Sequence, residues 1–514
     1  MPAVIISICV ILCAFAAAVA ATFYATKIRL RKKRSHSLTI DYSECEGKVS
    51  HCATGWLYGM AEKDVPSRNL LKALAPDVAV CKVPGGKQHP VGDLLDTAET
   101  FMSAGGRRLM VYLQDLFPDW YYVYEGQEDF LAKVRFAMPL ILGQPFADKT
   151  ACCPFNENEN GKWYGDFRKE ASRKLFYADW LAVYKVIREY SADIKIAGPG
   201  FMNYNEEYME DFLRFCIEND CLPDITIWHE LSKHSYYRFE KNYDAYRALE
   251  QKLGLSPIEI CISEYGQMCD NGVPGKMVQY ISMFESKKVS ACIAFWRLAD
   301  NLGELAADND APAAAWWLYH RYGEMRGNTY RATNAEPIKS RFRAVTSYDE
   351  EKRLITVIAG GGNGKASIEL RNVNTLKGLE NAAVLYAEKE YIEYSGLGYA
   401  TTAPSKCAPF AVKVTEGGAR IELENIREDK AYRITLSATP RVSVSVTPIC
   451  AEGTRYEAEC AEYVGLDRKE RANALYKINY AASGKGLVRN VSGKGKAVTF
   501  TVSVPKEGEY TVKV

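Results

Sequence analysis

Between residues 48 and 326, short apolar runs alternate with longer amphipathic segments. The short runs are rich in valine and isoleucine, as in strands that are covered on both faces. The longer segments place apolar residues three and four positions apart, which predicts helices, most clearly at residues 169–188 and 206–219. The predicted strands are residues 52–58, 78–83, 109–114, 150–155, 194–197, 225–228, 258–262 and 291–295.

Eight strands that alternate with helices predict a (β/α)8 barrel, the TIM barrel, over residues 48–326. A doubly wound open sheet is the alternative. Its nucleotide-binding form has no support, because no Gly-x-Gly-x-x-Gly motif follows the first predicted strand.

From Gly327 onward the apolar segments become shorter, often alternate with polar residues and are separated by turn residues. This pattern predicts an antiparallel β-sandwich over residues 327–446. Residues 447–514 predict a second, partial β-sandwich. The sequence stops inside a strand-like segment, VPKEGEYTVKV, so we expect this last domain to be truncated.

The N-terminal residues 1–26 contain an uncharged apolar run that is followed by six basic residues between Lys27 and Arg34. A bilayer needs about 20 apolar residues, so the run predicts a transmembrane segment or signal anchor. Residues 27–47 are then expected to form a basic, polar linker. The positive charges favour a cytoplasmic body, whereas the function inferred below favours an extracellular or cell-surface one, so the orientation stays open.

Charge and cysteine content narrow the class of protein. The formal net charge is +1, which gives no argument for a nucleic-acid partner. Several of the 15 cysteines lie inside predicted strands, where a thiol behaves as a small apolar group. We therefore expect mostly free thiols, with Cys45–Cys52 and Cys216–Cys221 as the pairs to examine.

Two carboxylates stand where barrel enzymes carry their chemistry. Glu157 follows the fourth predicted strand directly after Asn156, and Glu264 follows the seventh. The carboxyl ends of barrel strands meet at one mouth, so these groups are expected to face each other. Glycoside hydrolysis needs such a pair, one to protonate the leaving oxygen and one to attack the anomeric carbon or activate water.

The Asn-Glu pair and the later Glu resemble those of clan A retaining glycoside hydrolases. The stretches LAVYKVIREYSADIKIAGPGF, FLRFCIEND and LPDITIWHE are similar to glycoside hydrolase family 39, which includes β-xylosidases and α-L-iduronidases. The resemblance implies that Glu157 is the acid/base and Glu264 the nucleophile, that His229 and Trp296 contact the sugar, and that catalysis needs no cofactor. The chain departs from the family where Asn158 replaces the usual proline.

Other residues complete the predicted site. Glu159 and Glu230 are further carboxylates, either of which could be the true acid. The loops after the second, third and fourth strands carry polar and aromatic residues, which we expect to bind the sugar, although ordinary loop structure would also explain them. These residues are Gln88, His89, Asp115, Trp120 and Trp163.

The last domain has a resemblance of its own. The segments Tyr456–Glu459 and Ala482–Gly484 resemble parts of carbohydrate-binding modules of families 6 and 35. The resemblance implies a structural calcium ion held by Glu457 and Glu459, whose carboxylate oxygens suit that ion.

Together these features predict a membrane-anchored retaining glycoside hydrolase that acts on an oligosaccharide or polysaccharide by double displacement. A non-catalytic carbohydrate-binding surface protein with a barrel scaffold is one alternative. A transglycosylase or lyase on the same barrel is another. The sugar and the linkage stay open, because a fold supports many substrates.

Overall fold

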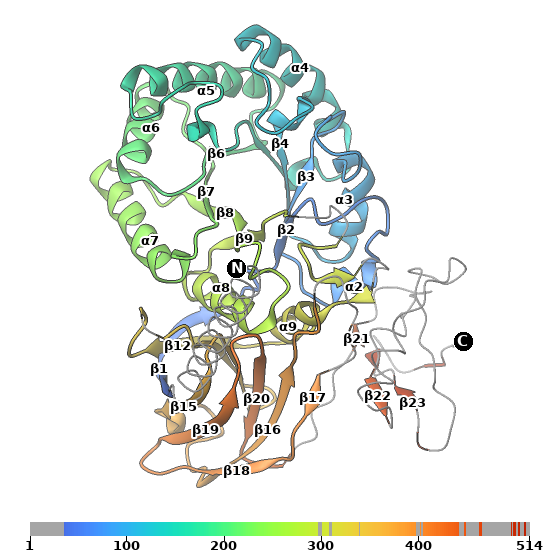
Figure 1. Ribbon diagram of the computed structural model, residues 1–514, viewed down its shortest axis with the longest axis vertical. Helices are drawn as coiled ribbons and strands as arrows, with labels where there is room; N and C mark the ends of the chain where they lie inside the picture. The colour runs from blue at the N-terminus through green and yellow to red at the C-terminus, as the bar shows by residue number, and fades with distance from the viewer. Residues whose placement is uncertain are drawn as a thin grey trace, which may run out of the picture.

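The computed structural model describes residues 35–440, apart from 297–300, 308–310, 339, 397–400 and 402–403. Beyond residue 440 it describes only 447–448, 462–464, 495, 497–499, 502–503 and 508–509. A barrel ringed by helices lies beside a large sheet (Figure 1). None of the helices in the described part of the chain is long and apolar enough to cross a bilayer. The predicted anchor at residues 1–26 lies outside the described residues.

The barrel confirms the predicted fold class. Its parallel strands follow one another in chain order and close between the first and the last, where Trp56 pairs with Ile293. Each strand overlaps a predicted one. The strands are β2 (Gly55–Leu57), β3 (Val78–Lys82), β4 (Arg108–Tyr112), β5 (Thr150–Cys153), β6 (Lys195–Phe201), β7 (Ile225–Glu230), β8 (Glu259–Tyr265) and β9 (Ser290–Ile293).

Helices cover the outside of the barrel (Figure 1). Their apolar faces pack on the strands, and their N-termini are capped in several cases by a side chain, as when Asn205 accepts from the Tyr208 N–H at 3.0 Å. The helices are α2 (Arg68–Lys72), α3 (Leu94–Ser103), α4 (Gln127–Gly143), α5 (Glu170–Tyr190), α6 (Glu206–Glu218), α7 (Ser235–Lys252), α8 (Pro274–Lys287) and α9 (Ala314–Gly323). Short 3-10 turns η1 (Leu113–Leu116), η2 (Ala147–Lys149) and η3 (Asn158–Asn160) lie in the loops.

The second domain is a 10-stranded sheet in which neighbours run antiparallel, except for the parallel pair β1–β15. It curls around its own apolar core and matches the predicted sandwich. Its strands are β1 (Ser35–Lys48), β12 (Asn328–Asn334), β13 (Arg343–Asp349), β14 (Leu354–Gly360), β15 (Gly364–Arg371), β16 (Val384–Ile392), β17 (Ser405–Lys406), β18 (Phe410–Lys413), β19 (Ala419–Ile426) and β20 (Ala431–Ser437).

Strand β1 overturns part of the predicted linker at 27–47. It lies between β12 and β15 in the sheet. Leu38, Ile40 and Tyr42 are at most 3% exposed, while the residues between them face outward or are only partly covered. This alternation is the period of a half-buried strand, and the polar residues of the outer face made the segment look like a linker. The barrel is therefore inserted between β1 and the rest of the sandwich.

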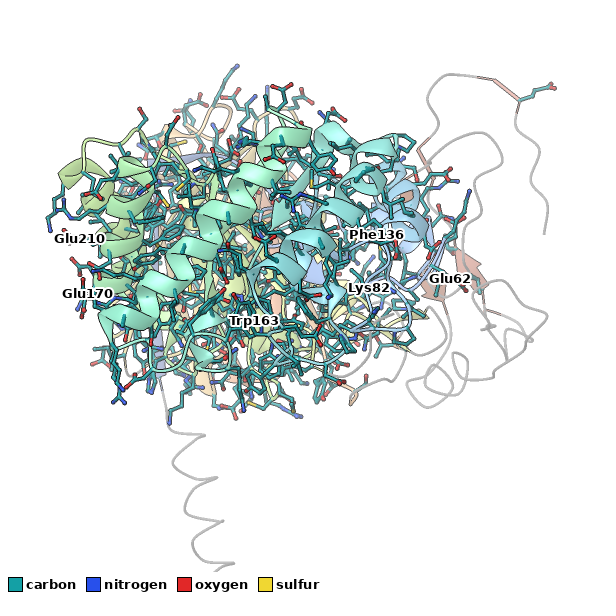
Figure 2. The ribbon with its side chains drawn as sticks, turned by 90° about the horizontal axis from the view of Figure 1, so that it is seen from above. Glu62, Lys82, Phe136, Trp163, Glu170 and Glu210 are labelled. Carbon is teal, nitrogen blue, oxygen red and sulfur yellow. The ribbon has the colours of Figure 1, made fainter. Side chains whose placement is uncertain are left out.

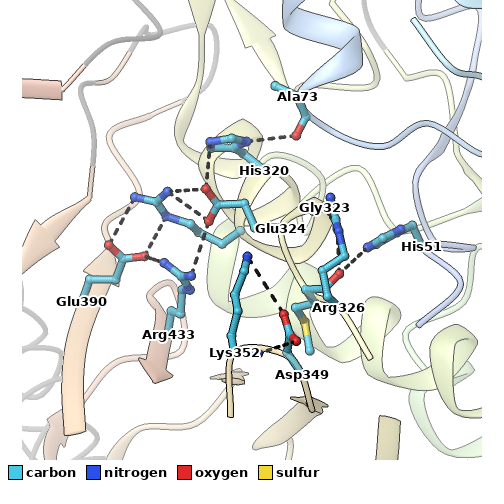
Figure 3. A network of polar contacts seen from close by, with 12 residues as sticks. His51, Ala73, His320, Gly323, Glu324, Arg326, Asp349, Lys352, Glu390 and Arg433 are labelled. Carbon is cyan, nitrogen blue, oxygen red and sulfur yellow. Dashed lines mark hydrogen bonds and ion pairs between the residues drawn. The ribbon is translucent and has the colours of Figure 1, made fainter. Parts of the chain in front are cut away.

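The two domains pack closely through α8 and α9. Gly275 at the start of α8 touches the β19–β20 turn, where a Cβ atom would come within 2.5 Å of the Glu428 and Lys430 carbonyl oxygens. At α9 the contact is ionic: Arg321 of this helix pairs with Glu390 of β16, which also pairs with Arg433 of β20 (Figure 3). The sandwich thus forms one continuous structure with the barrel.

The remaining predictions have mixed outcomes. Every cysteine of the described residues is a free thiol, including Cys45, Cys52, Cys216 and Cys221. Glu457 and Glu459, with the predicted calcium site, lie outside the described residues. Minor two-stranded pairs are β10 (Ala306–Ala307) with β11 (Ala311–Pro312), β21 (Thr447–Pro448) with β24 (Val502–Ser503), and β22 (Glu462–Val464) with β23 (Ala497–Thr499).

Candidate active site

Glu264 lies near the end of β8, at the mouth of the barrel, and is 9% exposed. The neighbouring strand β7 pairs with β8 through a register irregularity between Trp228 and His229. Past this point His229 pairs directly with Glu264. Such a bulge re-aims a side chain, and here it places the imidazole beside the carboxylate.

Glu157 follows β5 in a left-handed backbone conformation with φ of 53°. Its N–H donates to the Gly200 carbonyl at 2.7 Å, and the N–H of Asn156 donates to the buried Gln114 side chain at 2.5 Å. Gly200 is needed for this approach, since a Cβ there would lie 2.3 Å from the Phe155 carbonyl oxygen. Strand β6 and η1 therefore fix the backbone that carries Glu157.

Glu157, His229 and Glu264 form one buried cluster. The Nδ1 atom of His229 lies 3.0 Å from Glu157 Oε1, and its Nε2 atom lies 3.7 Å from Glu264 Oε1. One ligand atom from each of the three residues lies within 4.8 Å of the other two. Carboxyl groups about 5 Å apart are typical of retaining glycosidases, in which the second carboxylate attacks the sugar directly.

The cluster holds two carboxylates for one imidazole, and its pKa values reflect this imbalance. Burial raises the pKa of Glu264 to about 7, helped by the charge of Glu157 and opposed by His229. Burial alone would lower the pKa of His229, but Glu264 and Glu157 outweigh it and raise that pKa to about 9. At neutral pH the imidazole therefore carries a proton between the two acids.

The two further carboxylates have other surroundings. Glu230 accepts hydrogen bonds from Trp228 Nε1 at 3.1 Å and from Asn242 at 3.2 Å, so its side chain is held by the core. Glu159 lies on η3, where burial raises its pKa to about 7, but it is not part of the close cluster. The geometry favours Glu157 as the partner of Glu264.

A second polar group lines the barrel next to the pair. Asp115 accepts from Tyr58 Oη at 2.6 Å and from Tyr122 Oη at 2.9 Å. Gln88 accepts from Tyr58 at 3.2 Å, and the His89 ring lies 4.3 Å from the Tyr58 ring. Gln88, His89 and Asp115 are thus brought together as predicted from their loops, around two tyrosines that the sequence analysis did not select.

Several buried polar atoms of this region have no hydrogen-bond partner among the described residues. They include Asn156 Oδ1 and His89 Nε2. Burial lowers the pKa of His89 to about 4, so the ring is neutral and offers one donor and one acceptor. Unpaired buried polar atoms are costly, and a hydroxyl-rich ligand would satisfy them.

The predicted tryptophans occupy three different environments. Trp296 is partly buried and donates to the Gly266 carbonyl at 3.1 Å, just beyond β8. Trp163, which is labelled in Figure 2, packs against Tyr124 and donates to the Tyr122 carbonyl at 3.0 Å, so it holds the backbone of Tyr122. Trp120 is 43% exposed at the rim.

Sequence analysis missed Tyr58, Tyr112 and Tyr122. Tyr112 donates to Glu264 Oε1 at 3.5 Å, and the other two hold Asp115. Tyr112 ends β4 and Tyr58 directly follows β2, so polar residues at strand ends were the available signal. The cluster of Glu157, His229 and Glu264 has a spacing that could hold a metal ion, but glycoside hydrolases of this fold need no cofactor for catalysis.

Comparisons with known proteins bear on the class of enzyme and on the fold. No protein-family model matches the chain. A 3-O-β-L-arabinopyranosyl-α-L-arabinofuranosidase of Bifidobacterium pseudocatenulatum is 30% identical over 551 residues, covering 94% of this chain and 56% of that protein. A 3-O-α-D-galactosyl-α-L-arabinofuranosidase of Bifidobacterium longum subsp. longum is 28% identical over 545 residues, covering 93% and 47%. The chain spans about half the length of these curated relatives.

Solved structures support the same fold. The structure of N2152 from Neocallimastix frontalis has a TM-score of 0.71 and 26% identity, and the match covers 79% of this chain and 100% of that one. A bacterial orthologue of human α-L-iduronidase has a TM-score of 0.51 and 11% identity, covering 80% and 85%. The curated relatives are glycosidases and the solved structures share this fold, which agrees with the resemblance to clan A glycoside hydrolases of the family 39 type.

Proposed function

We propose that the chain is a retaining glycosidase that cleaves α-L-arabinofuranosides by double displacement. The observation that carries the proposal is the buried cluster in which His229 lies between Glu157 and Glu264. Both curated relatives are named as α-L-arabinofuranosidases, which supports the choice of sugar. Both names also place a further sugar on O3, so we propose an arabinofuranosyl unit that carries a sugar at O3.

In the first step Glu157 gives its proton to the glycosidic oxygen while Glu264 attacks the anomeric carbon. The bond to the leaving group breaks, and a glycosyl-enzyme forms on Glu264. In the second step Glu157 takes a proton from water, the water oxygen attacks the anomeric carbon, and Glu264 leaves. Two inversions leave the configuration unchanged.

His229 has a positioning role in this scheme. Its positive charge stabilises the ionised form of Glu264, which is the form that attacks. Its contact with Glu157 at 3.0 Å holds that side chain towards the same centre. The side-chain oxygen of Asn156, directly before the acid, has no hydrogen-bond partner among the described residues and could accept from a sugar hydroxyl next to the reacting carbon.

The test compares Glu264→Ala and Glu157→Ala in the purified full chain, with sodium azide added. The substrates are 2,4-dinitrophenyl α-L-arabinofuranosides with and without a sugar on O3, beside the matching β-xyloside and β-galactoside. Azide in the place of Glu264 attacks from the nucleophile's side, so that variant is expected to give the inverted β-azide. Azide in the place of Glu157 attacks the glycosyl-enzyme and is expected to give the retained α-azide.

The outcomes separate the competing functions. A Glu264→Ala variant with full activity contradicts the assignment of the nucleophile. A parent chain that binds but does not cleave any of these glycosides supports a non-catalytic carbohydrate-binding protein. Longer products from the parent indicate a transglycosylase, and an unsaturated product indicates a lyase.

Three predictions about the whole protein stay proposals. Attachment to a membrane through residues 1–26 is supported by the apolar run, and a position at the cell surface by the proposed action on carbohydrate, against the positive charges of residues 27–34. A carbohydrate-binding module at 447–514, with calcium at Glu457 and Glu459, rests on its sequence resemblance. Fractionation of cells with and without residues 1–26 tests the first two, and calcium binding to the Glu457→Gln variant tests the third.

A further inference from the structure

Two solvent-exposed aromatic rings are stacked on each other at the rim of the barrel. Trp120 and Tyr121 are 43% and 38% exposed, and their ring centroids lie 3.6 Å apart at an angle of 29°. Single exposed apolar residues are normal on a protein surface. Two large rings side by side in water are less common, and such patches often mark a binding surface.

A charged side chain from a second loop completes this surface. The Lys162 Nζ atom lies 5.4 Å from the centre of the Tyr121 ring. Lys162 follows η3 in the loop after β5, while the aromatic pair lies in the loop after β4. Both loops leave the carboxyl ends of neighbouring strands, which is the end of the barrel that carries Glu157 and Glu264. We call Trp120, Tyr121 and Lys162 the rim platform.

The rim platform is tied to the pocket by the next residue of the chain. Tyr122 turns inward and donates to Asp115 at 2.9 Å. Its carbonyl oxygen accepts from Trp163 Nε1 at 3.0 Å. The backbone below the platform is therefore fixed to the site on one side and to a packed indole on the other. A surface held in this way loses little freedom when it binds a ligand.

We infer that the rim platform binds a sugar ring of the substrate that lies outside the catalytic pocket. The inference rests on the proposed function and adds the substrate class: a branched oligosaccharide or polysaccharide rather than a small glycoside. A pyranose ring has one face of C–H groups, which stacks on aromatic rings, and hydroxyls at its edge, which accept from the Lys162 ammonium. The platform's continuity with Tyr122 and Asp115 makes a sugar of the same substrate its occupant.

The test compares two substrates in the full chain. One is the short dinitrophenyl arabinofuranoside, and the other is a soluble polysaccharide with α-L-arabinofuranosyl side chains. The double variant Trp120→Ala/Tyr121→Ala is expected to raise KM for the polysaccharide about tenfold, the effect of losing one good ring contact, and to leave the short substrate unchanged. Tyr190→Ala is the control, because Tyr190 is 40% exposed at the end of α5, on the opposite side of the barrel.

A binding measurement keeps the inference separate from catalysis. In a Glu264→Gln background, electrophoresis through a gel that contains the polysaccharide is expected to retard the chain, and the double variant is expected to lose the retardation. The inference is overturned if the gel retards the double variant as much as the Glu264→Gln chain. It is also overturned if the double variant changes KM equally for the short substrate and the polysaccharide. A dimer that the double variant abolishes, without any change in retardation, overturns it as well. If the parent chain cleaves no arabinofuranoside, but the gel retards it and the double variant loses this retardation, only the proposed function is contradicted.

Discussion

Two buried ionic clusters in this molecule have opposite balances of charge. At the mouth of the barrel, Glu157 and Glu264 share one histidine, His229. At the interface of the domains, Arg321 and Arg433 meet Glu324 and Glu390, with two charges of each sign (Figure 3). Both clusters are largely buried. The pKa values of their carboxylates therefore differ because of the balance of acidic and basic groups, and not because of the degree of burial.

The pKa values show the consequence. At the mouth, burial raises the pKa of Glu264 to about 7. At the interface, burial also acts to raise the pKa of Glu390, but Arg321 and then Arg433 reverse it, and the pKa is lowered. A balanced cluster holds its charges in place, whereas an unbalanced one keeps a carboxylate close to its uncharged form. Carboxylates whose pKa is raised in this way are typical of catalytic sites.

The largest effect is expected from removing the acid at the mouth. Glu157→Gln is expected to lower kcat on substrates with poor leaving groups by about 10²–10⁴, the usual contribution of general acid–base catalysis. Dinitrophenyl glycosides need no protonation, so their first step is expected to change little. Glu159→Gln is the matched control. A larger loss in that variant than in Glu157→Gln would show that Glu159 is the acid.

A substitution at the domain interface is expected to lower the free energy of unfolding rather than the catalytic rate. Glu390→Gln leaves two buried arginines with a single carboxylate, and breaking such a pair costs roughly 3–5 kcal/mol of the free energy of unfolding. Denaturant unfolding measures this loss. Glu369→Gln is the control, because its pair with Arg371 is about half exposed and such pairs contribute roughly 0–1 kcal/mol. Equal effects of the two substitutions would contradict the comparison.

At the mouth the same type of substitution is expected to act in the opposite direction. The folded pKa of Glu264, about 7, lies above the ordinary glutamate value of 4.5, so ionising Glu264 destabilises the fold as pH rises through 7. Glu264→Gln is therefore expected to raise the melting temperature at pH 8 while abolishing activity. A lower melting temperature would show that this carboxylate stabilises the fold.

The smallest effect is expected in the pH profile. Glu264 must be ionised to attack, so kcat/KM of the parent is expected to rise with pH through about 7. His229→Asn removes the positive charge that favours the ionised form. The rising limb is then expected to move upward by about one pH unit, equivalent to about 1.4 kcal/mol. An unmoved limb would show that His229 acts on neither carboxylate in the free enzyme.

Local patterns in the sequence were sufficient for the barrel and for the ends of its strands. Residues that end or directly follow parallel strands share one mouth whatever the details of packing, so Glu157, Glu264, Gln88, His89 and Asp115 could be selected from their positions. Strand β1 was missed because its outer face is polar, and only pairing with β12 and β15 reveals it.

Other features depended on contacts between distant segments. The register shift that brings His229 beside Glu264 arises between β7 and β8, and the choice between Glu157 and Glu159 follows from where the Gly200 carbonyl holds the chain. Nothing near Trp120 in the sequence indicates that its side chain is largely exposed while Trp163 is partly buried against the core. Periodicity along one segment thus determined the fold class and the strands, because it reports which residues face a core. The tertiary structure alone decided which acids meet, because that depends on distances across the barrel.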